Sequence, residues 1–197
     1  MGRRITLTLH GSPRALLPSV KPPRSEFGEL ARALCGSAVP IRAIAGDQQA
    51  SLFAAGVEAG TTKVTFGTGI FLMQIIGEEF FLLPPFFTTC AVGVIGKPVF
   101  ALEAKIESCA ARVTPLIGRE KEMNALLDEF TAQTARFVEK LPIRPKELVI
   151  DGGVTQAPHL KDALVRAIGL PVREHAIFDG TALGIARLLV LASSKNI

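Results

Sequence analysis

Apolar residues along the chain keep one of two spacings, and each spacing predicts one kind of element. Short alternating or continuous apolar runs that end at Gly, Pro or Asp are typical of strands. The chain has such runs at residues 41–45, 63–66, 70–76, 79–83, 88–95, 98–103 and 148–150. We expect residues 79–83 to pair with residues 70–76, and residues 88–95 to pair with residues 98–103 across Gly96-Lys97.

Apolar residues that recur at helical spacing predict several helices. In residues 122–141 one apolar face is formed by Leu126, Leu127, Phe130, Thr134, Phe137, Val138 and Leu141. Residues 48–56 and 156–168 also favour helix, and residues 181–193 are apolar nearly all round, which predicts a buried helix. Antiparallel strands followed by alternating helices and strands indicate an α/β domain with a mixed sheet flanked by helices.

The beginning of the chain differs from the rest in its proline content. It is interrupted by Pro13, Pro18, Pro22 and Pro23. We therefore expect a mostly extended leader over residues 1–40, with one short helix at residues 26–34. Residues 41–197 would form one domain. With 197 residues, 48% hydrophobic and 20% charged, the chain can bury a core of its own.

Charge and cysteine content argue against several classes of function. The formal net charge is +4, but the basic residues are scattered, which is typical of a solvated surface rather than a nucleic-acid interface. Cys35, Cys90 and Cys109 lie far apart, so we expect reduced cysteines in the core and no metal site among the side chains. Without an apolar run long enough for a membrane or a signal peptide, we expect a cytoplasmic protein that contacts neither membrane nor nucleic acid.

Asp47 is the first candidate for chemistry. It follows Gly46, which lets the backbone approach a ligand closely, and the expected strand at residues 41–45 would end at its carboxylate. Carboxylates at strand ends of α/β folds tend to face the ligand crevice, where Asp47 could take a proton from a nucleophile. From spacing alone, the simpler interpretation is that Asp47 caps the helix over residues 48–56.

Two glycine turns are candidates for holding a phosphate. Gly67-Thr68-Gly69 lies between two expected strands and offers backbone N–H groups and a hydroxyl. Asp151-Gly152-Gly153 lies between a strand and a helix, an order found where nucleotides approach the backbone. Each turn also has a plain interpretation, since glycine is the usual residue of tight hairpin turns and of loops with unusual backbone angles.

Together these motifs are more specific than any one alone. The segments that carry the pattern are GDQQA at 46–50, FGTGIFL at 66–72, TT at 88–89, ALE at 101–103, AQTAR at 132–136, DGG at 151–153 and TALG at 181–184. On these segments the chain resembles the FGGY family of carbohydrate kinases, and the resemblance covers only the C-terminal domain of such kinases. It implies an actin-like, ribonuclease-H-like fold and a kinase that uses ATP and Mg²⁺ to phosphorylate a sugar or polyol.

The resemblance also implies roles for single residues. Asp47 matches the base that deprotonates the substrate hydroxyl, while Gln48 and Phe71 match residues that touch the substrate. Thr68 matches a residue at the nucleotide phosphates, and Gly153 one that lies against the nucleotide. The residues expected around the nucleotide are Gly67, Thr68, Gly69, Gly152 and Gly153.

Several departures separate the chain from the family pattern. Ala110 stands where a nucleotide-binding glycine is expected, Ala157 replaces an asparagine, and Asp179 replaces a glutamate. The long segment that the family carries before its Gln-Thr-Arg helix is absent. Ala110 and Ala157 lose contacts to the nucleotide, so we expect weak nucleotide binding.

The first domain of the family supplies a phosphate loop and most sugar contacts, and the sequence contains no such loop. An active kinase would then need a second protein chain that carries the N-terminal lobe, or the sequence is a fragment of a longer kinase. The alternative is a non-catalytic, actin-like interaction module derived from a kinase. One block of the chain is crowded with Phe71, Phe80, Phe81, Phe86 and Phe87. Phe86 and Phe87 follow two prolines, which should break the strand and leave both rings exposed on a loop. Exposed rings there would favour a homodimer or a contact with a second chain.

Overall fold

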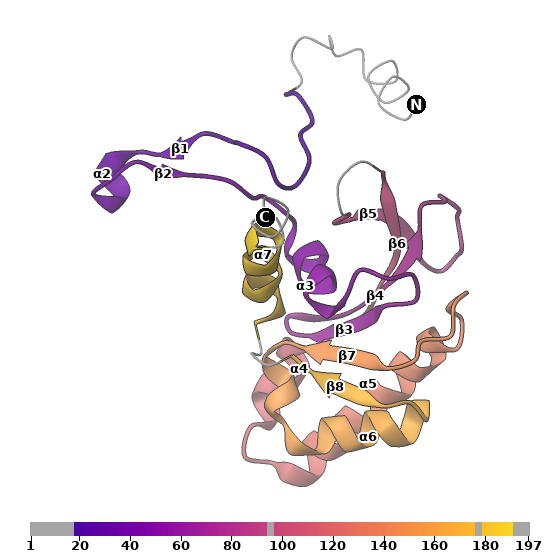
Figure 1. Cartoon of the computed structure of the whole chain (residues 1–197). Coiled ribbons are helices and arrows are strands. Elements are labelled where there is room, and N and C mark those ends of the chain that lie inside the picture. The colour runs from indigo at the N-terminus through magenta and orange to yellow at the C-terminus, as the bar shows by residue number, and fades with distance from the viewer. Residues whose placement is uncertain (1–17, 94–96, 176–178, 191–197) are drawn as a thin grey trace, which may run out of the picture.

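The computed structural model describes residues 18–93, 97–175 and 179–190. Its centre is a six-stranded mixed sheet with the strand order β5-β6-β4-β3-β7-β8 (Figure 1). The strands are β3 Thr62–Phe66, β4 Gly69–Gly77, β5 Phe87–Ala91, β6 Val99–Ser108, β7 Leu148–Asp151 and β8 Val172–Glu174. The pairs β5–β6, β6–β4 and β4–β3 are antiparallel, whereas the pairs β3–β7 and β7–β8 are parallel. The expected mixed sheet flanked by helices is thus confirmed.

Helices cover both faces of this sheet. They are α3 Asp47–Ala55, α4 Ala110–Val113, α5 Glu120–Val138, α6 Pro158–Ile168 and α7 Gly180–Val190, with 3-10 turns at Thr114–Leu116 and Gly153–Gln156. On one face, Val64 and Phe66 of β3 are buried in the main core with leucines of α5 and α6, such as Leu127 and Leu164. On the other face, Leu52 of α3 packs against β4. Alternate residues of β3 therefore point to the α5–α6 core and to α3.

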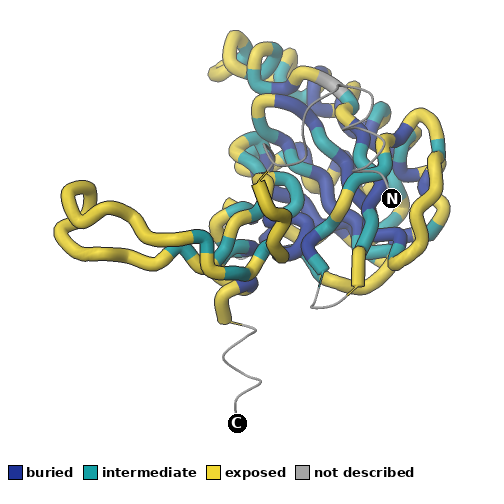
Figure 2. Tube along the Cα trace, turned by 90° about the horizontal axis from the view of Figure 1, so that it is seen from above, coloured by how far each residue is buried: buried dark blue, intermediate teal, exposed yellow. Residues whose placement is uncertain are grey.

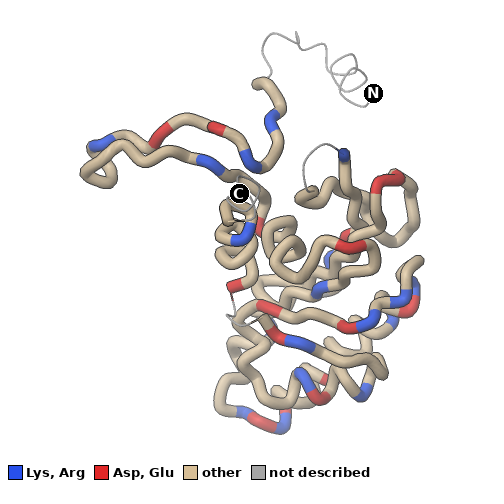
Figure 3. The backbone as a smooth tube through the Cα atoms, viewed as in Figure 1, with Lys and Arg blue, Asp and Glu red and all other residues tan. Residues whose placement is uncertain are grey.

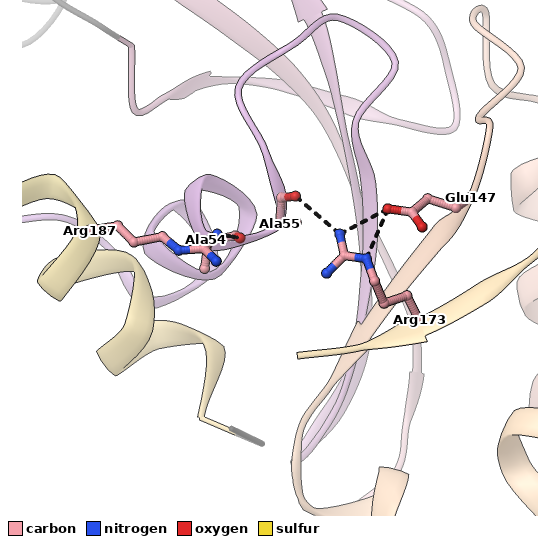
Figure 4. Close-up of polar contacts among 5 residues, drawn as sticks. All are labelled: Ala54, Ala55, Glu147, Arg173 and Arg187. Carbon is pink, nitrogen blue, oxygen red and sulfur yellow. Dashed lines mark hydrogen bonds and ion pairs between the residues drawn. The ribbon is translucent and has the colours of Figure 1, made fainter. Parts of the chain in front are cut away.

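Helix α7 packs closely on α3, and glycine makes this possible. A Cβ on Gly184 would clash with the carbonyl group of Ala50. The Arg187 guanidinium donates to the Ala54 carbonyl oxygen at the end of α3 (Figure 4). The outer side of α7 is exposed, with Val190 at 65%. The expected all-round burial of this helix is therefore wrong, because α7 lies outside α3 as a second layer.

Residues 18–46 form an extended arm that leaves the body beside α7 (Figure 1). It holds the short strands β1 Glu29–Leu30 and β2 Val39–Pro40, joined by α2 Arg32–Cys35. Nearly all of the arm is exposed (Figure 2). The expected helix at 26–34 is wrong, since Gly28 interrupts it at φ +109° and only four residues coil.

The expected strand at residues 41–45 is also wrong. This segment makes one isolated bridge, between Ala43 and Arg24, and its other backbone hydrogen bonds go to residues 23–28 on the outgoing side of the arm. The division of the chain at residues 40 and 41 stays a prediction.

Local sequence patterns predicted correctly the helices and the strand pairs whose residues lie close together in the sequence. The β3–β4 hairpin, α3, α5 and α6 lie within a few residues of their expected positions. The pairing of β5 with β6 is confirmed, and its turn at Gly96-Lys97 lies partly outside the described residues. The expected strand at 79–83 is wrong, because β4 pairs with β6 instead and Pro84-Pro85 follows the segment. Basic and acidic residues alternate along the backbone of the body (Figure 3).

The five phenylalanines of the crowded block have different surroundings. Phe86 is buried and its ring stacks edge-on against Phe137, with centroids 5.8 Å apart. Phe80 and Phe87 are exposed, at 58% and 74%. The expectation that Phe86 lies open on a loop is therefore wrong, while exposed rings remain on both sides of it.

Candidate functional site

The sequence motifs meet on the α3 face of the sheet, where β3 and β7 end. In the strand register, Phe71 of β4 lies opposite Thr65 of β3, and Thr65 lies opposite Asp151 of β7. Paired residues of neighbouring strands share a face, so these three side chains lie in one row. Lys63 lies two residues before Thr65 and points the same way. The row is covered by the beginning of α3.

Asp47 and Gln48 are the first two residues of α3. Gly46 is the N-cap and offers no side chain to the helix, so the capping interpretation of Asp47 is wrong. Asp47 is exposed, and one of its carboxylate oxygens, Oδ1, accepts the Gln48 N–H at 2.7 Å. A carboxylate in the first helical turn is stabilised by the helix dipole. The Thr181 hydroxyl of α7 donates to the Asp47 carbonyl oxygen at 3.2 Å, which brings the TALG motif to this point.

A buried chain of hydrogen bonds runs beneath these residues. Lys63 Nζ donates to Gln48 Oε1 at 2.5 Å and to Thr65 Oγ1 at 2.6 Å. Thr65 Oγ1 donates to Asp151 Oδ1 at 2.5 Å, and Ser51 Oγ donates to Asp151 Oδ2 at 2.5 Å. This network, defined by Gln48, Lys63, Thr65, Asp151 and Ser51, connects the start of α3 to the DGG turn.

Lys63 is the charged centre of the network and is only 1% exposed. Burial lowers the pKa of Lys63 from 10.5 to about 8, although the nearby carboxylates of Asp151, Asp47 and Glu103 oppose the change. An ammonium group in such a place is stable only when it is hydrogen-bonded and faces negative charge. The Lys63 side chain is therefore held in place by the hydrogen bonds and the carboxylates of the site.

His175 is the second buried titratable group near Asp151. It is 8% exposed, and its Nε2 has no hydrogen-bond partner in the described part of the chain. Burial lowers the pKa of His175, while the Asp151 carboxylate opposes the change. The buried surroundings therefore favour the neutral imidazole.

The two glycine turns lie next to each other at the ends of β3 and β7. Gly152 has φ +96°, and a Cβ there would clash with the backbone of Phe66, the last residue of β3. Gly153 and Thr68 are exposed. The Gly67 N–H is used by the Gly69 carbonyl at 3.1 Å, so it is engaged inside the turn. Gly153 N–H and the Thr68 hydroxyl are the more accessible donors.

Thr68 also lies beside one of the departures from the family pattern. Its carbonyl oxygen accepts the Cys109 N–H at 3.0 Å and the Ala110 N–H at 3.3 Å. Ala110, the first residue of α4, is therefore next to the expected phosphate turn. Ala157 is the N-cap of α6, beyond the DGG turn. Both departures thus border the place where a nucleotide is expected.

Four residues of the site were missed by sequence reasoning: Ser51, Lys63, Thr65 and His175. A signal for two of them exists in the sequence TKVTF of β3, where Lys63 and Thr65 alternate with the apolar Val64 and Phe66. Such alternation places both polar residues on one face of the sheet. Ser51 and His175 carry no comparable signal.

The described residues give three further results. Cys109 is buried, but Cys35 and Cys90 are exposed, so the expectation that the cysteines lie in the core is wrong for these two. The described residues contain no cluster of three or more His, Cys, Asp or Glu side chains that could hold a metal ion. Among them, too, no helix is long and apolar enough to span a membrane.

Known proteins that are similar to this chain in sequence include glycerol kinases. A scan of protein-family models finds no match. A glycerol kinase 2 of Thermotoga maritima is 30% identical over 94% of this chain and 50% of its own length, and a glycerol kinase of Thermus brockianus is 39% identical over 61% of this chain and 26% of its own length.

Solved structures give the same result for the fold. The structure of Plasmodium falciparum glycerol kinase with ADP has a TM-score of 0.80 at 21% identity, covering 94% of this chain and 49% of that one. A xylulose kinase of Rhodospirillum rubrum has a TM-score of 0.72 at 14% identity, covering 97% and 51%. Several of these matches cover nearly the whole chain, and there it spans about half the length of the relative.

Proposed function

Because the chain belongs to the FGGY family of carbohydrate kinases and has their actin-like fold, we propose that it is the C-terminal lobe of an ATP-dependent kinase for a sugar or polyol. Asp47 is the proposed general base. The observation that carries the proposal is the position of Asp47, which is exposed at the start of α3 while Gln48 beside it is held by a buried ammonium group.

The proposed reaction asks three things of this lobe. Asp47 accepts the proton of the substrate hydroxyl, and the hydroxyl oxygen bonds to the terminal phosphorus of ATP. The bond from that phosphorus to the bridging oxygen breaks, and ADP leaves with its electron pair. Gln48 and Phe71 contact the substrate. Thr68 and Gly153 donate hydrogen bonds to the nucleotide, with Gly67, Gly69 and Gly152 shaping the two turns.

Mg²⁺ would arrive on the ATP phosphates. It dehydrates reluctantly and usually takes only one or two carboxylates from a protein, which suits a site whose described residues form no larger acidic cluster. Both Asp151 oxygens accept hydrogen bonds from Ser51 and Thr65. Asp151 is buried, whereas Asp47 is exposed and would face the ATP-bound ion, while its role in the proposed reaction stays that of the proton acceptor.

The proposed enzyme is completed by an N-terminal lobe, carried by a second chain or by a part of the protein outside the given sequence, since the curated relatives are about twice as long. The alternative is a non-catalytic interaction module with the same fold. Ala110 and Ala157 favour the alternative, because the family makes nucleotide contacts at both positions.

Reconstitution tests the proposal. The chain is mixed with the N-terminal half of the Thermotoga maritima glycerol kinase 2, and ADP release from Mg·ATP is followed with glycerol, xylulose or gluconate. We expect ADP release that depends on one of these substrates and on both chains. Binding of the two halves without any substrate-dependent ADP release would support the interaction module instead.

A further inference from the structure

Gln48 lies at one end of the buried network, and Lys63 determines how its amide is turned. We propose that Lys63 is a positioning residue that holds Gln48 with Oε1 inward and Nε2 toward the substrate, so that Gln48 donates a hydrogen bond to a substrate oxygen. The inference rests on the proposed function, because a bound sugar or polyol receives that bond.

The donor and acceptor chemistry sets this orientation. An ammonium group has three N–H donors and no acceptor, so the Gln48 atom that lies 2.5 Å from Lys63 Nζ must be the carbonyl oxygen. The amide nitrogen is then on the opposite side. Gln48 is half-buried, and in the described part of the chain its Nε2 makes no hydrogen bond. Its two N–H groups are available beside the exposed Asp47.

Lys63 itself is fixed from below. Thr65 Oγ1 accepts the second hydrogen bond of the ammonium group at 2.6 Å and donates its own hydrogen to Asp151 Oδ1 at 2.5 Å. The Ser51 hydroxyl donates to the other Asp151 oxygen. The charged groups that face the ammonium are the carboxylates of Asp151, Asp47 and Glu103. With its side chain 1% exposed, Lys63 has no water to exchange for these partners.

Two variants separate positioning from mere folding. Gln48→Glu keeps an acceptor for Lys63 and strengthens the pair by adding a charge, but it removes the donor that faces the substrate. Lys63→Met removes the ammonium, so that the Gln48 amide can present either its oxygen or its nitrogen. Gln74→Met is the matched control, because Gln74 is also a buried polar residue and donates to Thr62 and Ile143 away from the site.

The kinetic experiment uses the chain with the N-terminal half supplied. We expect Gln48→Glu and Lys63→Met to raise the KM for the sugar or polyol about tenfold, the effect of one hydrogen bond, and to change the KM for ATP by less than about twofold. Gln48→Glu should melt no lower than the wild type, and Gln74→Met should keep both KM values. Unchanged substrate KM in Gln48→Glu would overturn the proposal.

A spectroscopic experiment on the lone chain decides the Lys63–Gln48 link even if reconstitution gives no activity. The Gln48 side-chain amide is identified by its loss from the ¹H–¹⁵N spectrum of Gln48→Glu. We expect its shift to follow the protonation of Lys63, with a midpoint near the pKa of about 8, and to lose this transition in Lys63→Met. A pH-independent Gln48 signal in the wild type would overturn the link. An inactive wild-type mixture with a normal Gln48 titration would instead count against the proposed function.

Discussion

Lys63 should make the protein more stable as the pH rises above about 8. Folding lowers the pKa of Lys63 from 10.5 to about 8 through burial. Between these two values the unfolded chain binds more protons than the folded chain, so the free energy of unfolding increases with pH. Below about pH 8 both states are protonated, and the destabilising effect of the buried charge is then fully present.

The size of this effect follows from the pKa difference. At about 1.4 kcal/mol for each pH unit, the change from 10.5 to about 8 corresponds to about 3 kcal/mol over the whole range. About 2 kcal/mol of it falls between about pH 7 and about pH 9.5. Because the side chain is 1% exposed, solvent screening reduces this figure little.

Urea unfolding of the wild type and of Lys63→Met at these two pH values measures the effect. The chain has no Trp and no Tyr, so far-UV circular dichroism follows the transition. The readout is the difference between the two proteins, in which the titration of groups that do not interact with Lys63 cancels. We expect the wild type to gain about 2 kcal/mol relative to Lys63→Met from the lower to the higher pH. An equal difference at both pH values would refute the reasoning.

The remaining predictions concern the nucleotide turns, the helix packing and the exposed rings. Mg·ADP should bind the lone chain with a Kd of about 1 mM, since Ala110 and Ala157 lack family contacts; calorimetry measures this, and micromolar binding would contradict it. Gly184→Val should lower the free energy of unfolding by about 2 kcal/mol or more, because its side chain would meet the Ala50 carbonyl; an unchanged Tm would speak against close packing of α3 and α7. Phe87→Ser should weaken self-association, as its ring is 74% exposed; light scattering tests this, and a monomeric wild type would exclude it.

The parts of the fold that could be predicted are those with local causes. Alternation in TKVTF and the glycine turn at Gly67-Thr68-Gly69 specify the β3–β4 hairpin, and one apolar face specifies α5. Residues 79–83 are as apolar as a strand, but the choice of a partner for β4 depends on the distant β6. Loop closure and long-range pairing of this kind leave no local pattern.

The candidate site divides in the same way. Asp47 and the glycine turns could be found because their motifs are short and continuous. The alternation in TKVTF places Lys63 on one face of β3 with Thr65, but its role could not be predicted. That role depends on contacts with Gln48 from a helix and, through Thr65, with Asp151 from a parallel strand. In the sequence Lys63 is one of 22 basic residues, most of which are solvated. Only the packing of α3 on the sheet distinguishes it.

The central claim is that Asp47 acts as the base of a carbohydrate kinase. The most direct test is the substrate-dependent rate of ADP release by the reconstituted pair, measured for the wild type and for Asp47→Asn. The Asp47 side chain is exposed and accepts a hydrogen bond from the N–H of its neighbour Gln48. The variant should therefore fold as the wild type does and retain nucleotide binding. We predict that its turnover falls about a hundredfold or more, the usual effect of removing a general base. Turnover of Asp47→Asn equal to that of the wild type would contradict the account.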